Sequence, residues 1–216
     1  MSALSDDERR KARPSPASEE TPKPLDLVRG AAADCLRVLS QVPAELLEKT
    51  ARLLARTLAE GGTIHLCGNG GSASQAQHLA GELVGRFQME RPALAAVALN
   101  ADTAILTAVG NDYGFDRVFA RQVQGLMKPA DLLWALSTSG RSPNILAALA
   151  AAKAAGGRTL LFCGPDIPEG LDLDAVITAP SAPTPRIQEF HLFCGHTLCQ
   201  LTEHLLFNAP GELGRE

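Results

Sequence analysis

At residue 63 the sequence changes from one repeating pattern to another. From there on, short apolar segments alternate with longer stretches of helical periodicity, and turns rich in Gly, Ser and Asn separate them. We expect strands over 63–67, 95–99, 132–136, 159–163 and 175–178, and helices over 72–87, 103–109, 115–126, 143–155 and 187–207. Because parallel strands need crossover connections, usually helices, this order predicts an α/β fold: a three-layer sandwich with a five-stranded parallel sheet flanked by helices.

Two further helices are expected before this region. Between residues 25 and 60 the apolar residues recur at spacings of three and four, and Pro43 divides them into two runs. The first 24 residues hold four prolines among charged residues and have almost nothing to bury, so we expect a mobile leader over 1–24 and one domain over 25–216. The leader contains acids and lacks an amphipathic arginine pattern, unlike an organelle transit peptide.

Composition excludes several kinds of partner. The chain has 216 residues, with 20 Lys and Arg against 24 Asp and Glu, a formal net charge of −4. No general positive field is available to hold a nucleic acid, and no apolar stretch approaches the roughly 18 residues of a membrane span. The five cysteines form no C-x-x-C pair, so we expect them to be reduced and mostly buried. These features favour a cytoplasmic protein without nucleic-acid or membrane partners.

The clearest candidate for ligand binding is the loop after the expected strand 132–136. It reads Ser137-Thr138-Ser139-Gly140-Arg141-Ser142. Pro143 then stands at the first position of the next helix. Hydroxyl groups, free backbone N–H groups and the positive end of a helix together suit an anion such as a phosphate monoester. The alternative is that Ser142 only caps the helix, but one cap does not account for four hydroxyl residues in a loop of six.

A second loop follows the expected strand 63–67. It reads Gly68-Asn69-Gly70-Gly71-Ser72. With Ala73, its glycines satisfy the dinucleotide pattern G-x-G-x-x-A only loosely. A dinucleotide site also needs an acid about 20 residues further on, whereas Asp102, the first acid past the second strand, is about 30 residues away. Asn69 and Ser72 beside bare glycine backbone favour hydrogen bonds to a sugar phosphate instead.

His78 and Glu82 are four residues apart on the expected helix 72–87, so their side chains share one face and are able to hold one ion or substrate. An exposed helical pair is the alternative. The last helix carries Gln188 and His196, with further polar groups among its apolar residues. About 12 Å of helix rise separates these two, too far for one ion. If all four serve one site, we expect it at an oligomer interface, with His196 from another chain than the other three.

The remaining histidines are interpreted as structural. His65 lies within an expected strand and His204 near the end of the chain, and both are expected to be structural or solvated rather than ligands. His191 sits among apolar residues of the last helix, where we expect a hydrogen-bonded core histidine.

Five strings occur along the chain with His196 after them. They are Cys-Gly-Asn-Gly-Gly-Ser (67–72), Ala-Gln-His-Leu-Ala-Gly-Glu-Leu (76–83), Gly-Asn-Asp-Tyr-Gly-Phe (110–115), Ser-Thr-Ser-Gly-Arg-Ser (137–142) and Arg-Ile-Gln-Glu (186–189). Together they resemble the phosphoheptose isomerases, which are single-domain members of the SIS (sugar isomerase) group. The resemblance spans about residues 30–207, and the leader has no counterpart in it.

The resemblance implies conversion of sedoheptulose 7-phosphate into D-glycero-D-manno-heptose 7-phosphate, an early step of activated-heptose biosynthesis for the lipopolysaccharide core or other glycans. It also implies a homotetramer with active sites between subunits and one Zn²⁺ per subunit. Carried over by position, the zinc ligands are His78, Glu82, Gln188 and His196. The phosphate would bind Ser137, Thr138, Ser139 and Ser142. The sugar would contact Asn69, Gly70, Gly71, Ser72, Glu82, Asn111, Asp112 and Gln188. Pro185 replaces an acid that some members carry before Arg-Ile-Gln-Glu, which removes any role for that acid here.

Aldose–ketose isomerisation needs one group to move a proton between two carbons through an enediol, and another to exchange protons on the two oxygens. We assign the carbon proton to Glu82 and the oxygen proton to His196. Zinc would polarise the carbonyl as a Lewis acid, but a zinc-bound carboxylate is a weak base, so Glu82 would have to leave the metal when substrate binds.

Two other functions remain open at this stage. One is an isomerase of another phosphosugar. The other is a non-catalytic SIS module that binds a protein partner such as the bacterial replication initiator. The presence of both Glu82 and His196 favours catalysis, because the partner-binding relatives lack this acid and this histidine.

Overall fold

A computed structural model describes residues 21–167, 169–181 and 183–214. The chain divides into two compact units, Met1–Ala33 and Asp34–Glu216. The helix α2 (Pro24–Leu39) begins in the first unit and ends in the second. After Pro43 follows α3 (Ala44–Ala59), which confirms the two helices expected before the sheet. Most of the leader expected over 1–24 lies outside the described residues.

A sheet of five parallel strands forms the centre of the second unit. The strands are β1 (Ile64–Gly68), β2 (Ala96–Ala98), β3 (Leu132–Ser137), β4 (Arg158–Cys163) and β5 (Ala175–Thr178). Their order across the sheet is β2-β1-β3-β4-β5, and in the register Leu66 of β1 lies between Ala98 of β2 and Trp134 of β3. All five expected strands are therefore present, and they pair as a parallel sheet.

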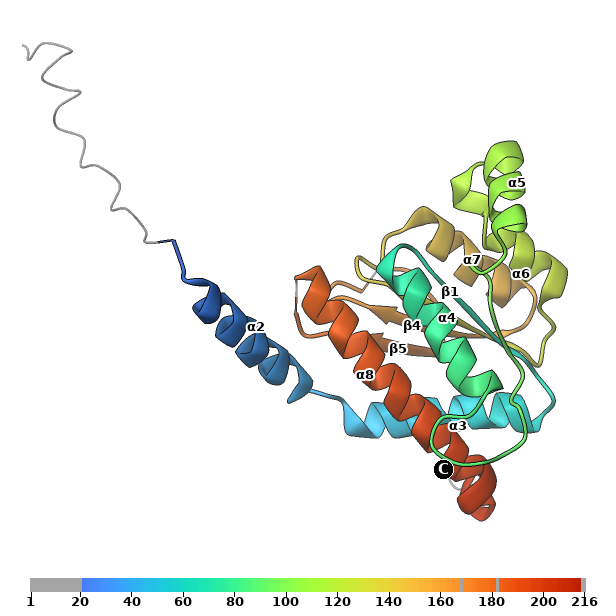
Figure 1. Cartoon of the computed structure of the whole chain (residues 1–216). Coiled ribbons are helices and arrows are strands. Elements are labelled where there is room, and N and C mark those ends of the chain that lie inside the picture. The colour runs from blue at the N-terminus through green and yellow to red at the C-terminus, as the bar shows by residue number, and fades with distance from the viewer. Residues whose placement is uncertain (1–20, 168, 182, 215–216) are drawn as a thin grey trace, which may run out of the picture. The chain divides into compact units, whose positions relative to one another are not determined.

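Helices cover both faces of this sheet, as the three-layer prediction requires (Figure 1). One face carries α3, α4 (Gly71–Val84) and α8 (Thr184–Glu203), and the other carries α6 (Ala120–Leu126) and α7 (Pro143–Ala154). Alternate residues of a strand point to opposite faces. Trp134 accordingly packs in the core under α4 and α8, whereas its neighbours Leu133 and Ala135 pack in the core under α7.

The expected single helix over 115–126 is wrong. The chain instead forms a 3₁₀ turn, η1 (Phe115–Arg117), and then α6. Residues 118–120 are all buried, and three consecutive residues spread over about 200° of an α-helix, more than one packing face covers. The last helix also differs from 187–207, because α8 ends at Glu203 and a π-helical turn, η2 (His204–Asn208), follows before η3 (Pro210–Glu212).

The strand order places two loops side by side. From β1 the chain moves to β2 on one side of it and then to β3 on the other, with α5 (Thr103–Tyr113) in the connection. Ligands of open α/β sheets bind at the carboxyl ends of the strands where the strand order reverses in this way. The glycine loop after β1 and the serine loop after β3 flank that point.

Two expectations about the chain as a whole are tested by the described residues. None of the described helices has both the length and the apolar character that crossing a bilayer requires. All five cysteines are free thiols, four of them buried and Cys35 half-buried. Burial raises the pKa of the Cys67, Cys194 and Cys199 thiols to about 12, which keeps them protonated and unreactive.

Candidate active site

The serine loop is an open turn in front of a helix. Gly140 has a φ of 65°, as expected for the glycine of this turn. Pro143 is the first residue of α7, and Ser142 makes no side-chain capping bond to that helix. Its hydroxyl lies 3.3 Å from the Ser137 hydroxyl instead. The capping alternative therefore fails for Ser142, and the start of α7 presents its positive end beside a group of hydroxyls.

A small hollow lies next to this loop. It has a volume of about 240 Å³, and Thr138, Ser139 and Arg141 line one side of it. Asp166 lines it as well and forms an exposed ion pair with Arg141, with 3.2 Å between Nη2 and Oδ2. Two larger hollows, of about 590 and 490 Å³, lie along α3, and none of the site residues expected from the sequence lines them. The smaller hollow is therefore the candidate ligand site, because site residues expected from the sequence line it.

The glycine loop is joined to the serine-loop side of the sheet by a pair of amides. Asn69 Nδ2 donates to Asn144 Oδ1 at 2.9 Å, and Asn144 Nδ2 donates back to Asn69 Oδ1 at 2.8 Å. Asn144 is buried in the first turn of α7, so the two hydrogen bonds join the start of that helix to the loop after β1. Sequence reasoning missed Asn144. A polar residue directly after the helix-initiating proline was the available signal.

The side chain of Gln188, a residue of α8, lies against the start of α4. A side chain on Gly71 would collide with the Gln188 amide, so the Gln188 side chain would have to shift to make room for it. Gln75 Nε2 donates to the Gln188 backbone carbonyl at 2.6 Å and so ties α4 to α8 at this end. Ser72 is buried in the same turn. Gln188 therefore lies beside the glycine loop, and its predicted contact with the sugar stays a prediction.

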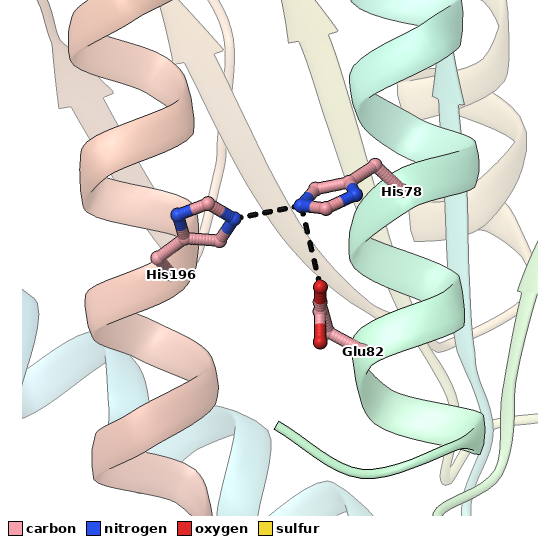
Figure 2. Close-up of side chains that lie close together, drawn as sticks. All are labelled: His78, Glu82 and His196. Carbon is pink, nitrogen blue, oxygen red and sulfur yellow. Dashed lines mark hydrogen bonds and ion pairs between the residues drawn. The ribbon is translucent and has the colours of Figure 1, made fainter. Parts of the chain in front are cut away.

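His78, Glu82 and His196 converge within one chain (Figure 2). His78 and Glu82 project from α4 toward His196 on α8, because these two helices pack against each other. The Nε2 atoms of His78 and His196 are 2.7 Å apart, and His78 Nε2 is 3.4 Å from Glu82 Oε1. One atom from each of the three side chains lies within 4.8 Å of the other two. This arrangement is able to hold a metal ion or to exchange protons with a bound molecule.

The cluster combines partial burial with access to solvent. The His78 side chain is 45% exposed and that of Glu82 is 23% exposed. Burial and the neighbouring His78 lower the pKa of His196, while the Glu82 carboxylate opposes that shift. His196 is therefore held toward its neutral form, which is the form that ligates a metal or accepts a proton.

The expected assignment of His196 to a second chain is wrong for this cluster. Gln188 and His196 do lie at different places along α8, Gln188 beside Gly71 and His196 beside His78. Because α4 packs against α8, His196 meets His78 of the same chain. Gln188 lies beside Gly71, which is seven residues before His78 on α4.

Asn111 and Asp112 lie on α5, where both side chains are exposed. Asn111 Nδ2 donates to Asp112 Oδ1 at 2.8 Å. Among the described residues no hydrogen bond joins either of them to the glycine or serine loop. Their predicted contact with the sugar stays a prediction.

The other histidines occupy the positions interpreted as structural. His65 is buried in β1 with its Nε2 3.2 Å from Asp131 Oδ2, and His204 is exposed. His191 is fully buried, and its Nε2 lies 3.0 Å from the Cys163 carbonyl oxygen. Burial lowers the pKa of His191 to about 4, so the ring is neutral and donates this bond, as expected for a core histidine.

The sheet is parallel, and the serine loop, which is suited to an anion, lies at the carboxyl ends of its strands where the strand order reverses. This combination is typical of α/β proteins that bind small phosphorylated ligands. The SIS-domain family matches residues 29–162 of the chain. That range includes the glycine loop, the His78–Glu82 pair and the serine loop.

Relatives narrow this class. The phosphoheptose isomerase of Solidesulfovibrio magneticus is 53% identical over 171 residues, which cover 79% of this chain and 84% of that protein. The phosphoheptose isomerase of Burkholderia pseudomallei is 47% identical over 189 residues, covering 85% and 96%. The solved structure of the Neisseria gonorrhoeae phosphoheptose isomerase has a TM-score of 0.78 at 37% identity, covering 84% of this chain and 99% of that one. The chain belongs to the SIS-domain family and, within it, to the phosphoheptose isomerases.

Proposed function

We propose that this protein is an aldose–ketose isomerase that converts sedoheptulose 7-phosphate into D-glycero-D-manno-heptose 7-phosphate, an early step of activated-heptose biosynthesis. One observation carries the proposal. Glu82 and His196, the acid and the histidine that this chemistry needs, meet within one chain on two packed helices. Relatives named phosphoheptose isomerases match along most of the chain, which supports the same activity here.

The serine loop would hold the phosphate. Its hydroxyls at Ser137 and Ser142 lie 3.3 Å apart in front of α7, where phosphate oxygens would accept hydrogen bonds from both. Thr138 and Ser139 line the hollow beside them. Binding energy from the phosphate end positions the carbonyl end of the sugar, which is how a remote group raises the rate of the reaction.

Glu82 would carry the proton between C2 and C1 through an enediol, and His196 would exchange protons on the two oxygens. Both side chains are partly exposed, so a substrate is able to reach them. The neutral form of His196, favoured by its burial and by His78, accepts a hydroxyl proton and returns it to the other oxygen.

The residues present fit a zinc ion. Two imidazole nitrogens and one carboxylate oxygen within 4.8 Å of one another form a donor set typical of catalytic zinc, which keeps one position open. His78, Glu82 and His196 would hold the ion, and when bound it would supply Lewis-acid polarisation of the substrate carbonyl. Glu82 then has two roles, and its release from the metal would free it to act as the base.

The active assembly is proposed to be a homotetramer with sites between subunits. Helix α5 buries none of its residues although its sequence is largely apolar, and Ile105 and Tyr113 on it and Phe115 just after it are exposed. His78 opens to solvent at the surface of α4 and α8. A neighbouring subunit that covers these surfaces would exclude water from the reaction. It would also be the source of Gln188 if Gln188 is a fourth zinc ligand.

The test is incubation of zinc-loaded protein with sedoheptulose 7-phosphate in deuterated water, followed by NMR. We expect heptose 7-phosphate carrying deuterium at C2, because the enediol exchanges its proton with solvent. A folded His196→Gln variant, which keeps a polar side chain but cannot exchange protons in the same way, is the control and is expected to form no product. Folded, metal-loaded protein that turns over other phosphosugars but not this one would contradict the heptose assignment. Failure with every phosphosugar would favour the partner-binding alternative.

A further inference from the structure

A buried ion pair lies about two helix turns beyond His196 along α8. Arg91 Nε is 2.9 Å from Glu203 Oε1, and the two side chains are 1% and 3% exposed. Arg91 is in the segment after α4, and Glu203 is the last residue of α8. The pair therefore joins the ends of the two helices that carry His78, Glu82 and His196.

The carboxylate of Glu203 organises the segment after α4. It accepts hydrogen bonds from the backbone N–H groups of Phe87 at 2.9 Å, Gln88 at 3.0 Å and Met89 at 3.4 Å. Burial by itself raises the pKa of Glu203, but the N–H groups and Arg91 outweigh it and hold that pKa below its usual range. The carboxylate is therefore ionised and binds three successive N–H groups of a segment that has no regular secondary structure.

The guanidinium of Arg91 closes the end of α4. Its Nη2 donates to the Glu82 carbonyl at 2.8 Å, and its Nη1 donates to the Leu83 carbonyl at 2.7 Å. Nη1 also donates to the Gly85 carbonyl at 3.2 Å and to the Pro92 carbonyl at 3.1 Å. The last carbonyls of a helix have no partner within it, so this cation satisfies groups that would otherwise be unpaired. One of them belongs to Glu82 itself.

The same segment reaches the other catalytic side chain. Phe87, whose N–H is held by Glu203, places its ring 5.4 Å from the His196 ring, centroid to centroid, with the planes 30° apart. Arg91 thus contacts the backbone of Glu82, and Glu203 holds the residue that packs against His196. The two members of one ion pair act on the two groups assigned to proton transfer.

We propose that Arg91 and Glu203 are a positioning pair that sets the separation of Glu82 from His196. The inference rests on the proposed function for its link to catalysis. A buried ion pair contributes little net stability, because desolvating two charges offsets their attraction. Its geometric effect is larger, since a displacement of about 1 Å in a catalytic group costs up to about a hundredfold in rate.

The experiment compares Glu203→Gln with Asp131→Asn. Asp131 is also a buried carboxylate that accepts backbone N–H bonds, from Thr63 and Lys128, but it lies at the amino end of β3, away from the cluster. Both variants should lower the thermal midpoint. At a temperature where both are folded, we expect kcat to fall about ten- to a hundredfold for Glu203→Gln with little change in KM, and to stay near the parent value for Asp131→Asn.

Two further readouts do not depend on turnover. The zinc dissociation constant, measured by competition with a chelator, should rise about tenfold or more for Glu203→Gln only. The NMR signals of the His196 ring, identified by their loss in His196→Gln, should shift in metal-free Glu203→Gln and not in metal-free Asp131→Asn, because the Phe87 ring moves. If the parent protein has no isomerase activity, the proposed function fails while these two readouts still decide the positioning role.

Arg91→Lys is the milder variant if Glu203→Gln does not fold. It keeps the positive charge beside Glu203 but cannot reach all four carbonyls. We expect a smaller loss of kcat and a smaller shift of the His196 signals. Folded variants of either residue that match Asp131→Asn in kcat, zinc affinity and ring signals would overturn the proposal.

Discussion

The described residues include two histidine–carboxylate pairs with nearly the same separation in very different surroundings. His65 and Asp131 approach to 3.2 Å with side chains 5% and 6% exposed. His78 and Glu82 approach to 3.4 Å with side chains 45% and 23% exposed. The pair distance therefore does not separate a structural pair from a functional one. The surroundings of each pair do.

The difference lies in what else each pair contacts. Asp131 Oδ1 accepts the N–H of Thr63, and its Oδ2 accepts the N–H of Lys128 as well as facing His65. These three contacts occupy most of the acceptor sites of the carboxylate and join β1 to the start of β3. His78 instead faces a third titratable side chain, His196, and solvent. A carboxylate whose acceptor sites are mostly occupied by backbone N–H groups supports the fold. A carboxylate that faces a histidine and solvent is still able to bind a ligand or accept a proton.

The comparison is tested most strongly by exchanging each carboxylate for its amide. Glu82→Gln keeps the size of the side chain but removes the base, so we expect kcat to fall by about 10²- to 10⁴-fold. The free energy of unfolding should change by no more than about 0.5 kcal/mol, because Glu82 is partly exposed. Steady-state kinetics and urea unfolding on the same preparation measure both. Retention of near-parent turnover would remove Glu82 from the mechanism.

Asp131→Asn should show the reverse pattern. The amide cannot accept both backbone N–H bonds and face His65 as the carboxylate does, so we expect unfolding to become easier by about 3 kcal/mol. Activity per folded molecule should stay within about twofold of the parent. Denaturant titration by circular dichroism gives the first value. A stable but inactive Asp131→Asn protein would erase the distinction between the two pairs.

Metal affinity should distinguish His78 from an exposed histidine that lies in neither pair. We expect His78→Ala to weaken zinc binding by about tenfold or more, since it removes one ligand of the proposed site. His204→Ala, a change at an exposed histidine of η2, is the matched control and should leave the zinc affinity unchanged. Competition with a chromogenic chelator measures both variants. Equal zinc affinity in the two would exclude His78 as a ligand.

The smallest expected effect is the pH dependence of folding stability caused by the buried imidazole rings of His191 and His65. Burial lowers the pKa of His191 to about 4 and also lowers the pKa of His65, whereas both titrate near 6.5 in the unfolded chain. The unfolded state therefore takes up protons first, and stability that is complete above about pH 6.5 is lost as the pH falls toward 4. For His191 the loss should be about 2 kcal/mol between pH 7.5 and pH 5.

A His191→Gln variant tests this sign. The glutamine amide is still able to donate to the Cys163 carbonyl but does not titrate, so its stability should fall less steeply with acid than that of the parent. Chemical unfolding at a series of pH values, with His204→Gln as the exposed control, measures the slopes. Parallel profiles for His191→Gln and the parent would show that His191 is not the group responsible.

The elements that were predicted best are those whose signals are local. Pro143 begins α7 because a proline at the first helical position costs no hydrogen bond, and β5 has the bounds that its apolar run indicated. The pairing of His78 with Glu82 also followed from spacing alone, since residues four apart on a helix share a face. The helix over 115–126 was wrong because burial of three consecutive residues is imposed by the surrounding helices and leaves no mark in the periodicity of the segment.

The sequence by itself determined the α/β order, the two polar loops and the candidate chemical groups, because each depends on residues within one turn, strand or helix. Only the tertiary structure decided which groups meet. His196 is 118 residues from His78, Asn144 is 75 from Asn69 and Glu203 is 112 from Arg91. Their contacts depend on which helices and loops lie next to each other once the sheet has formed, and that follows from the packing of the whole core rather than from any local pattern.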